Sequence, residues 1–219
     1  SQYIAHLRTR FHRDESLSLG FYMDPREAKA RGTTPRSYFY RDAASPIDVE
    51  STLYHEASHQ LLFETAGPAR YDQNTGNYWV WEGLGTYFET LVPQADGSIL
   101  IGGAIGPRVQ EARRRIVENN DPVPIADLVA LNQDRFINDE NGHAVYFYYA
   151  ESMALTLFLM HHDQGRYRDR FLDYVSDAYR GRLRRNSSAP TLEDRLGVPY
   201  RELDAQLRTY LKSTEGPSG

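Results

Sequence analysis

The chain has 219 residues, no cysteine and a formal net charge of −5. This length is enough for one domain with a substantial hydrophobic core, whereas the negative charge argues against a surface that binds nucleic acid. No apolar run approaches the ~20 residues that a membrane-spanning helix needs, and the lack of cysteine excludes disulfide bonds and thiolate metal ligands.

Two short segments near the start of the chain have the composition of β-strands. Residues 19–23 and 36–41 are rich in aromatic side chains. Turn-forming residues lie between them, among them Asp24-Pro25 and Gly32. These features predict a small β-containing lobe over residues 1–45.

An uninterrupted helix is predicted over residues 46–66. Ser45 is placed as the N-cap, and Pro46 occupies the first helical position, where proline is favoured. Gly67-Pro68 provides the stop signal at the other end. The geometry of the middle of this helix should therefore be well fixed.

The sequence His55-Glu56-Ala57-Ser58-His59 lies in the middle of this predicted helix. Residues one turn apart share a face of a helix, so His55 and His59 can bind the same metal ion. Zn²⁺ accepts imidazole nitrogen at about 2.0–2.1 Å, and a catalytic zinc site keeps one position open for water. Glu56 is then placed to take a proton from that water rather than to bind the metal. The alternative is a pair of surface or core histidines, which the helical context disfavours.

Glu82 is the predicted third metal ligand. A second helix is predicted from about Trp79 to before Pro93, and it contains Gly83 and Gly85. Each glycine costs a helix roughly 1 kcal/mol relative to alanine. Close packing against the first helix, with both glycines at the contact, would offset that cost and bring the Glu82 carboxylate to the two histidines. The alternative is a solvated glutamate in a weakened helix.

The rest of the chain is predicted to be scaffold. The three arginines of residues 113–115 are expected on the solvated face of a helix, whereas Glu151 interrupts an apolar run and must be solvated, paired or at a cleft. The further predicted elements are a hairpin over 96–101, helices over 107–119, 125–131, 143–160, 167–179, 192–196 and 200–211, and a disordered tail over 213–219.

The histidine motif and the residues that follow it resemble those of a known peptidase group. H-E-x-x-H, followed by Glu82-Gly83 and by Tyr87-x-Glu89, resembles the gluzincin metallopeptidases, the broad group of thermolysin, the zinc aminopeptidases and leukotriene hydrolase. The pattern also resembles bacterial peptidase-MA-like domains. The resemblance implies a set of zinc ligands, namely His55, His59 and Glu82. It also implies that Glu56 is the general base and that Glu89 accepts a hydrogen bond from a metal-bound histidine; a surface glutamate is the alternative for Glu89.

Residues 143–155 resemble the gluzincin stretch in which a tyrosine hydroxyl hydrogen-bonds the oxyanion of the tetrahedral intermediate. Alignment on Ser152 nominates Tyr149 for this role, with Tyr146 or Tyr148 as alternatives. Aromatic side chains at helical spacing are otherwise core residues. Related peptidases also pair an extended substrate with an edge strand, and we put forward residues 36–41 for that role, with an ordinary core strand as the alternative.

Departures from related patterns narrow the expected activity. The metzincin pattern needs a glycine and then a third histidine after the motif, but Leu62 and Thr65 occupy those positions. The segment between His59 and Glu82 is longer than in thermolysin and the aminopeptidases, and the G-x-M-E-N signature that captures a substrate amino terminus is absent. Endopeptidase action is therefore favoured over the trimming of N-termini.

The sequence thus predicts an α+β, mainly α protein with a zincin-like fold, formed by one domain over residues 1–212 with a helical lobe over 46–212. The predicted function is that of a zinc-dependent metallopeptidase acting on a polypeptide substrate. The alternatives are a non-catalytic domain that keeps the zinc fold for binding or assembly, and a hydrolase of a non-peptide ester or amide. The chain begins at Ser1 rather than Met, as removal of a leader or an upstream domain would leave it, and the resemblance favours an extracytoplasmic bacterial setting. No sequence feature indicates an oligomeric state.

Overall fold

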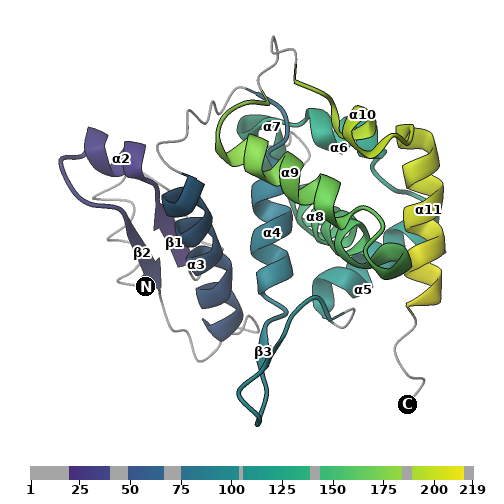
Figure 1. Cartoon of the computed structure of the whole chain (residues 1–219), viewed down its shortest axis with the longest axis horizontal. Coiled ribbons are helices and arrows are strands. Elements are labelled where there is room, and N and C mark those ends of the chain that lie inside the picture. Colours follow the sequence, from purple (N-terminus) through teal and green to yellow (C-terminus); the bar gives the residue numbers. More distant parts are fainter. Residues whose placement is uncertain are drawn as a thin grey trace.

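The structure is a computed structural model, and it describes residues 20–39, 49–66, 75–103, 106–138, 144–183 and 189–214. These residues form a mainly helical protein with two small antiparallel sheets, which confirms the predicted α+β, mainly α class. Figure 1 shows the first sheet at one end of the molecule and the helical body beside it. None of the described helices has both the length and the apolar character that crossing a membrane requires.

The predicted β-containing lobe has its two strands. Strands β1 (Gly20–Met23) and β2 (Arg36–Phe39) pair in an antiparallel arrangement. Phe21 and Tyr38 stack across the pair, with ring centroids 6.1 Å apart. Both strands are thus confirmed within the described residues, while residues 1–19 and 40–45 of the lobe lie outside them.

A short helix, α2 (Pro25–Ala30), connects the two strands where the sequence predicted only turns. Its first residue is proline, whose fixed φ suits the first helical turn. The Asp24 carboxylate accepts a hydrogen bond from the backbone N–H of Glu27 at 3.0 Å and so caps the helix. Asp24 and Pro25, which were predicted to form a turn, therefore lie at the start of helix α2.

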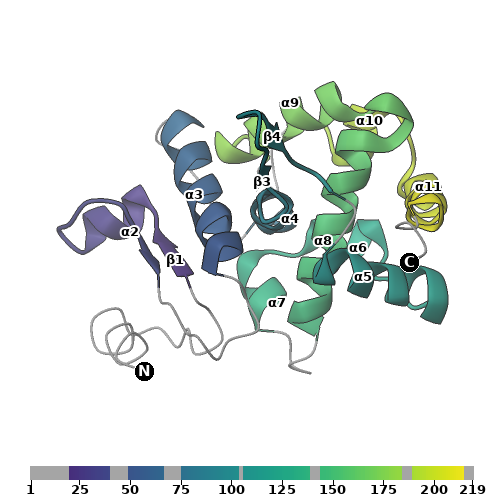
Figure 2. The ribbon, with the colours of Figure 1, turned by 90° about the horizontal axis from the view of Figure 1, so that it is seen from below.

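Helix α3 (Val49–Ala66) carries the histidine motif and lies between the β1–β2 sheet and the helical body in both views (Figure 1, Figure 2). The capping and stop signals predicted at Ser45-Pro46 and Gly67-Pro68 lie outside the described residues. Helix α4 (Trp79–Phe88) packs against α3 and also against helix α8 (Ala144–His161). Every residue of α4 except the last is buried, because protein surrounds this helix.

The two glycines of α4 show how closely its neighbours approach. A Cβ added to Gly85 would lie 2.6 Å from Cε1 and Nε2 of His55 on α3. A Cβ added to Gly83 would instead lie 2.5 Å from Oγ1 of Thr156 on α8. The prediction that both glycines face the motif helix is therefore confirmed for Gly85 and wrong for Gly83, because α4 is enclosed from two directions.

Helix α4 ends before the predicted limit near Pro93, because the chain turns at Glu89 and enters a hairpin. Strand β3 (Val92–Pro93) pairs with β4 (Ile99–Leu100), which confirms the predicted hairpin. Its turn is closed by Asp96, whose carboxylate accepts the backbone N–H of Ser98 at 2.9 Å.

Helix α8 forms the centre of the helical body. Residues 150–159 of this helix are all buried, as expected of a segment enclosed by protein, and their core neighbours include Trp79, Phe136 and Phe171. Each helix predicted in this part of the chain is present, whereas α7, η2 and the π-helical geometry of η1 were not predicted. The elements around α8 are α5 (Pro107–Arg113), the π-helix η1 (Arg114–Asn119), α6 (Ile125–Ala130), α7 (Gln133–Ile137), the 3₁₀ turn η2 (His162–Gln164), α9 (Arg168–Tyr179), α10 (Leu192–Leu196) and α11 (Tyr200–Ser213).

The predicted solvated face of residues 113–115 is wrong for two of its three arginines. Arg114 is exposed and pairs with Glu111, but Arg113 donates to the backbone carbonyl of Thr214 at 2.5 Å. The Arg115 side chain is only 13% exposed and contacts the buried Glu151. The Arg113 contact fixes the C-terminal end of α11, so the predicted disordered tail is also wrong for residues 213–214. Residues 215–219 lie outside the described residues.

Candidate metal centre

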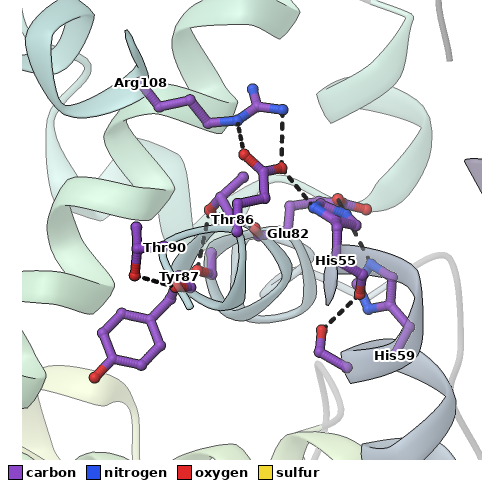
Figure 3. A network of polar contacts seen from close by, with 10 residues as sticks. His55, His59, Glu82, Thr86, Tyr87, Thr90 and Arg108 are labelled. Atoms are coloured by element: carbon purple, nitrogen blue, oxygen red, sulfur yellow. Dashed lines mark hydrogen bonds and ion pairs between the residues drawn. The ribbon is translucent and has the colours of Figure 1, made fainter. Parts of the chain in front are cut away.

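Three buried side chains from two neighbouring helices converge at the contact between α3 and α4. His55 and His59 lie one turn apart on α3, and Glu82 belongs to the first turn of α4. The Nε2 atoms of His55 and His59 lie 3.3 Å and 3.9 Å from Oε2 of Glu82. Figure 3 shows the three side chains directed toward one another.

This arrangement fits a single divalent cation. One candidate ligand atom from each of the three residues lies within 4.8 Å of the others. A tetrahedral zinc ion places its ligand atoms roughly 3.3 Å apart, because each bond is about 2.0–2.1 Å long. Two imidazole nitrogens and one carboxylate oxygen also form a donor set that zinc accepts. Sequence reasoning therefore selected residues that the fold brings together.

The charges in the cluster are strongly coupled. Burial lowers the pKa of His55, but hydrogen bonds with Glu82 and Glu89 outweigh burial and raise it to about 10. Burial and the charge on His55 lower the pKa of His59 to about 4. Burial raises the pKa of Glu82, yet the hydrogen bond with His55 and the charges of both histidines lower it to about 2. A divalent cation would replace the His55 proton as the positive charge beside Glu82.

Glu89, which follows the last residue of α4, contacts the other nitrogen of His55. Its Oε1 atom lies 2.8 Å from Nδ1 of His55, in the position that the sequence predicted. Metal-binding histidines commonly donate this second N–H to a carboxylate, which fixes the tautomer and the direction of the ring. This contact orients the Nε2 atom of His55 toward Glu82.

Glu56 follows His55 on α3 and lies beside strand β1. A Cβ added to Gly20 would approach Cγ of Glu56 to 2.9 Å, so the strand packs directly against this side chain. Burial and the charge of Glu82 are the larger causes of the raised pKa of Tyr149, and the negative charge of Glu56 adds to that shift. Strand β1 lies next to Glu56, whereas the strand put forward for substrate pairing was β2; that role stays a prediction.

The three candidate tyrosines occupy different environments. Tyr149 lies beside the cluster, with its ring centroid 6.4 Å from that of His55. Burial and the charge of Glu82 raise its pKa well above the ordinary value, so the hydroxyl stays protonated. Tyr146 is 64% exposed, and Tyr148 packs against Phe136. Of the three, Tyr149 is the residue that the fold places next to the histidines.

Sequence reasoning missed one residue of the site, Arg108 of α5. Its Nε and Nη2 atoms lie 2.8 Å and 3.2 Å from the two carboxylate oxygens of Glu89. The guanidinium carbon also lies 5.0 Å from the ring centroid of Tyr149. No motif or helical spacing links Arg108 to Glu89, because the β3–β4 hairpin separates them in the chain.

The remaining histidines do not join the cluster within the described part of the chain. The Nε2 atom of His161 lies 2.9 Å from the Tyr87 hydroxyl. His162 stacks on Tyr167. His143 and the two earlier histidines, His6 and His12, lie outside the described residues.

Glu151 is the buried acid that interrupts the apolar run of α8, and the structure shows it to be paired. Its carboxylate accepts the backbone N–H of Val123 at 2.9 Å and contacts Nε of Arg115 at 3.3 Å. Burial raises its pKa to about 7, although both contacts favour the ionised form. This carboxylate ties α8 to the segment that follows η1 and takes no part in the histidine cluster.

Comparison with known proteins places the chain in a family. A family model described as "Protein of unknown function (DUF1570)" matches residues 49–181. This range is more than half of the chain, so the chain belongs to that family. The matched range includes α3, α4 and α8 and thus every residue of the cluster described above. No curated protein and no solved structure matches the chain.

Proposed function

We propose that the chain is a zinc-dependent metallopeptidase that cleaves internal bonds of polypeptides. The observation that carries this proposal is the convergence of His55, His59 and Glu82, with Glu56 and Tyr149 beside them. Ligands, base and hydroxyl donor in one place are the parts that hydrolysis of an acyl bond requires. The resemblance to gluzincin peptidases in the same residues supports the choice of a peptide substrate.

His55, His59 and Glu82 would hold the metal through Nε2, Nε2 and a carboxylate oxygen. Bound zinc supplies Lewis acidity, which lowers the pKa of a water molecule and polarises a carbonyl oxygen. Glu89 keeps the His55 ring directed at the ligand position through its contact with Nδ1. The carboxylate of Glu56 accepts the proton from the water that attacks the carbonyl carbon and later delivers it to the leaving amine.

Tyr149 would stabilise the oxygen that gains negative charge during the attack. Its hydroxyl remains a hydrogen-bond donor at neutral pH because burial and the nearby Glu82 hold its pKa well above the ordinary value. A neutral donor directed at a developing oxyanion favours the transition state over the ground state. Glu56 and Tyr149 thus have separate roles, one in proton transfer and one in charge stabilisation.

The substitution Glu56→Gln tests the proposal. It removes the base but none of the metal ligands, so zinc content should be unchanged while peptide hydrolysis falls by about 10²–10⁴-fold. Glu64→Gln is the matched control, because Glu64 is an exposed glutamate two turns further along α3. Hydrolysis of casein and of end-blocked peptides should be measured with and without a chelator, beside ester substrates.

Equal peptide turnover by the Glu56→Gln variant and the unchanged protein would refute the assigned base. A zinc-loaded protein that cleaves esters but no peptide would point to a non-peptide substrate. A zinc-loaded protein that cleaves neither esters nor peptides would favour the other alternative, a non-catalytic domain that keeps the zinc fold for binding or assembly.

A further inference from the structure

We propose that Arg108 is a positioning residue that holds Glu89 against His55 and keeps Tyr149 beside the metal ligands. This inference rests on the metal centre of the proposed function, but it requires no catalytic step. Arg108 belongs to α5, so it brings a fourth helix to a cluster otherwise built from α3, α4 and α8 (Figure 3).

The first half of the proposal concerns the Glu89 carboxylate. Arg108 contacts both of its oxygens, Oε2 at 2.8 Å and Oε1 at 3.2 Å. The planar guanidinium matches a carboxylate in this two-point geometry and therefore fixes its direction. Oε1 is also the atom that lies 2.8 Å from Nδ1 of His55. Arg108 thus defines the orientation in which Glu89 can accept the His55 N–H.

The environment makes this ion pair stronger than an ordinary surface pair. The side chains of Arg108 and Glu89 are only 29% and 19% exposed. Without the guanidinium, Glu89 would lose its second partner and could rotate away from the histidine. The ring of His55 would then lose the contact that directs its Nε2 atom.

The second half of the proposal concerns Tyr149. The guanidinium carbon of Arg108 lies 5.0 Å from the centre of the Tyr149 ring, within the range of a cation–π contact. Helix α5 packs against α8, which carries this tyrosine. One arginine therefore contacts both the group that orients a metal ligand and the predicted hydroxyl donor. Removal of the Arg108 side chain should therefore change the positions of both Glu89 and Tyr149.

The decisive measurement is zinc affinity, obtained by competition with a chromophoric chelator, for the unchanged protein and for three variants. Arg108→Met should weaken zinc binding by about 10–100-fold, the usual effect of losing an outer partner of a metal ligand. Arg108→Lys should give an intermediate loss, because an ammonium group keeps the charge but cannot bind both oxygens in parallel. Glu89→Gln should weaken binding about as much as Arg108→Met.

A double substitution separates positioning from simple packing. If Arg108 acts through Glu89, the Glu89→Gln/Arg108→Met protein should bind zinc no more weakly than Glu89→Gln alone, since coupled residues are not additive. Arg114→Met is the matched control, because Arg114 pairs with Glu111 nearby at an exposed position. This control should bind zinc as the unchanged protein does.

Several outcomes would overturn the proposal. One is an Arg108→Met affinity equal to that of Arg114→Met, and another is a fully additive double variant. If Arg108→Met fails to fold, as judged by thermal unfolding in chelator, the same cycle with Arg108→Lys decides the question. Stoichiometric zinc without peptide hydrolysis would refute the proposed function alone, whereas absence of zinc binding by the unchanged protein would refute both.

Discussion

Two buried glutamates occupy different regions of the molecule and differ in the partners that surround them. Glu82, 5% exposed, lies between α3 and α4, and Glu151, 2% exposed, lies on α8. Histidine contacts lower the pKa of Glu82 to about 2 in spite of burial. Burial dominates for Glu151 and raises its pKa to about 7, although Arg115 and the Val123 N–H favour the ionised form.

The partners of a buried acid distinguish a possible metal ligand from a structural contact. The nearest partners of Glu82 are imidazole nitrogens, and a metal ion can bind to these and to the carboxylate at once. The partners of Glu151 are a guanidinium and a backbone N–H, which donate hydrogen bonds and cannot bind a cation. Glu82 therefore has the surroundings of a ligand, and Glu151 those of a structural link.

The largest expected difference between the two regions is in metal binding. Glu82→Ala removes one of three ligands, so zinc affinity should fall by more than about 100-fold, beyond the usual effect of losing an outer partner. Glu151→Gln should bind zinc as the unchanged protein does, because its carboxylate lies outside the cluster. Competition with a chelator measures both. Equal zinc affinities of the Glu82→Ala and Glu151→Gln proteins would contradict the assignment of Glu82, and not Glu151, as a metal ligand.

Smaller effects are expected from substitutions of Gly85 and Gly83, through which α4 contacts α3 and α8. Gly85→Ala would place Cβ 2.6 Å from the His55 ring, so zinc affinity should fall by about tenfold or more through displacement of this ligand. Gly83→Ala meets Thr156 and the Ser152 backbone of α8 instead. It should lower the free energy of unfolding by about 1–3 kcal/mol through overpacking. Zinc titration should therefore show the larger loss of affinity in Gly85→Ala. Chemical denaturation should show the larger loss of stability in Gly83→Ala.

The third expected effect is a pH dependence assigned to Glu151. Its pKa is raised on folding, so the folded protein binds the proton more tightly than the unfolded chain does. The stability contributed by protonated Glu151 is therefore complete below the ordinary glutamate pKa and is lost as the pH rises toward about 7. Relative to Glu151→Gln, the unchanged protein should lose up to about 1.4 kcal/mol per pH unit in this window.

Chemical denaturation at several pH values between 5 and 8, with chelator present, measures that difference. The chelator removes any contribution from metal binding to the histidine cluster. A stability difference that is independent of pH would show that Glu151 does not titrate in this range.

The sequence was most informative where one helix alone determines the geometry. His55 and His59 share a face because they are one turn apart, and this required no knowledge of the fold. Glu82 needed one further argument, the cost of Gly83 and Gly85 in a helix. That argument selected a carboxylate that the fold brings to the two histidines, although Gly83 faces α8.

Contacts made by several elements could not be predicted in the same way. Arg108 reaches Glu89 because the β3–β4 hairpin reverses the chain between them, and local periodicity contains no information about that reversal. Arg115 was assigned to solvent because it belongs to a run of three arginines, and such a run usually lies on the solvated face of a helix. It lies in a π-helical segment, whose wider turns shift the faces of the helix, and it contacts Glu151.

X-ray absorption at the zinc edge, on purified protein loaded with one equivalent of zinc, tests the central claim most directly. We expect one tightly bound zinc per chain, with two imidazole ligands at about 2.0–2.1 Å and the remaining donors oxygen. The Glu82→Ala protein should lose this bound zinc. Weak, non-stoichiometric binding, or a coordination shell without two imidazoles, would show that His55, His59 and Glu82 do not form a zinc site.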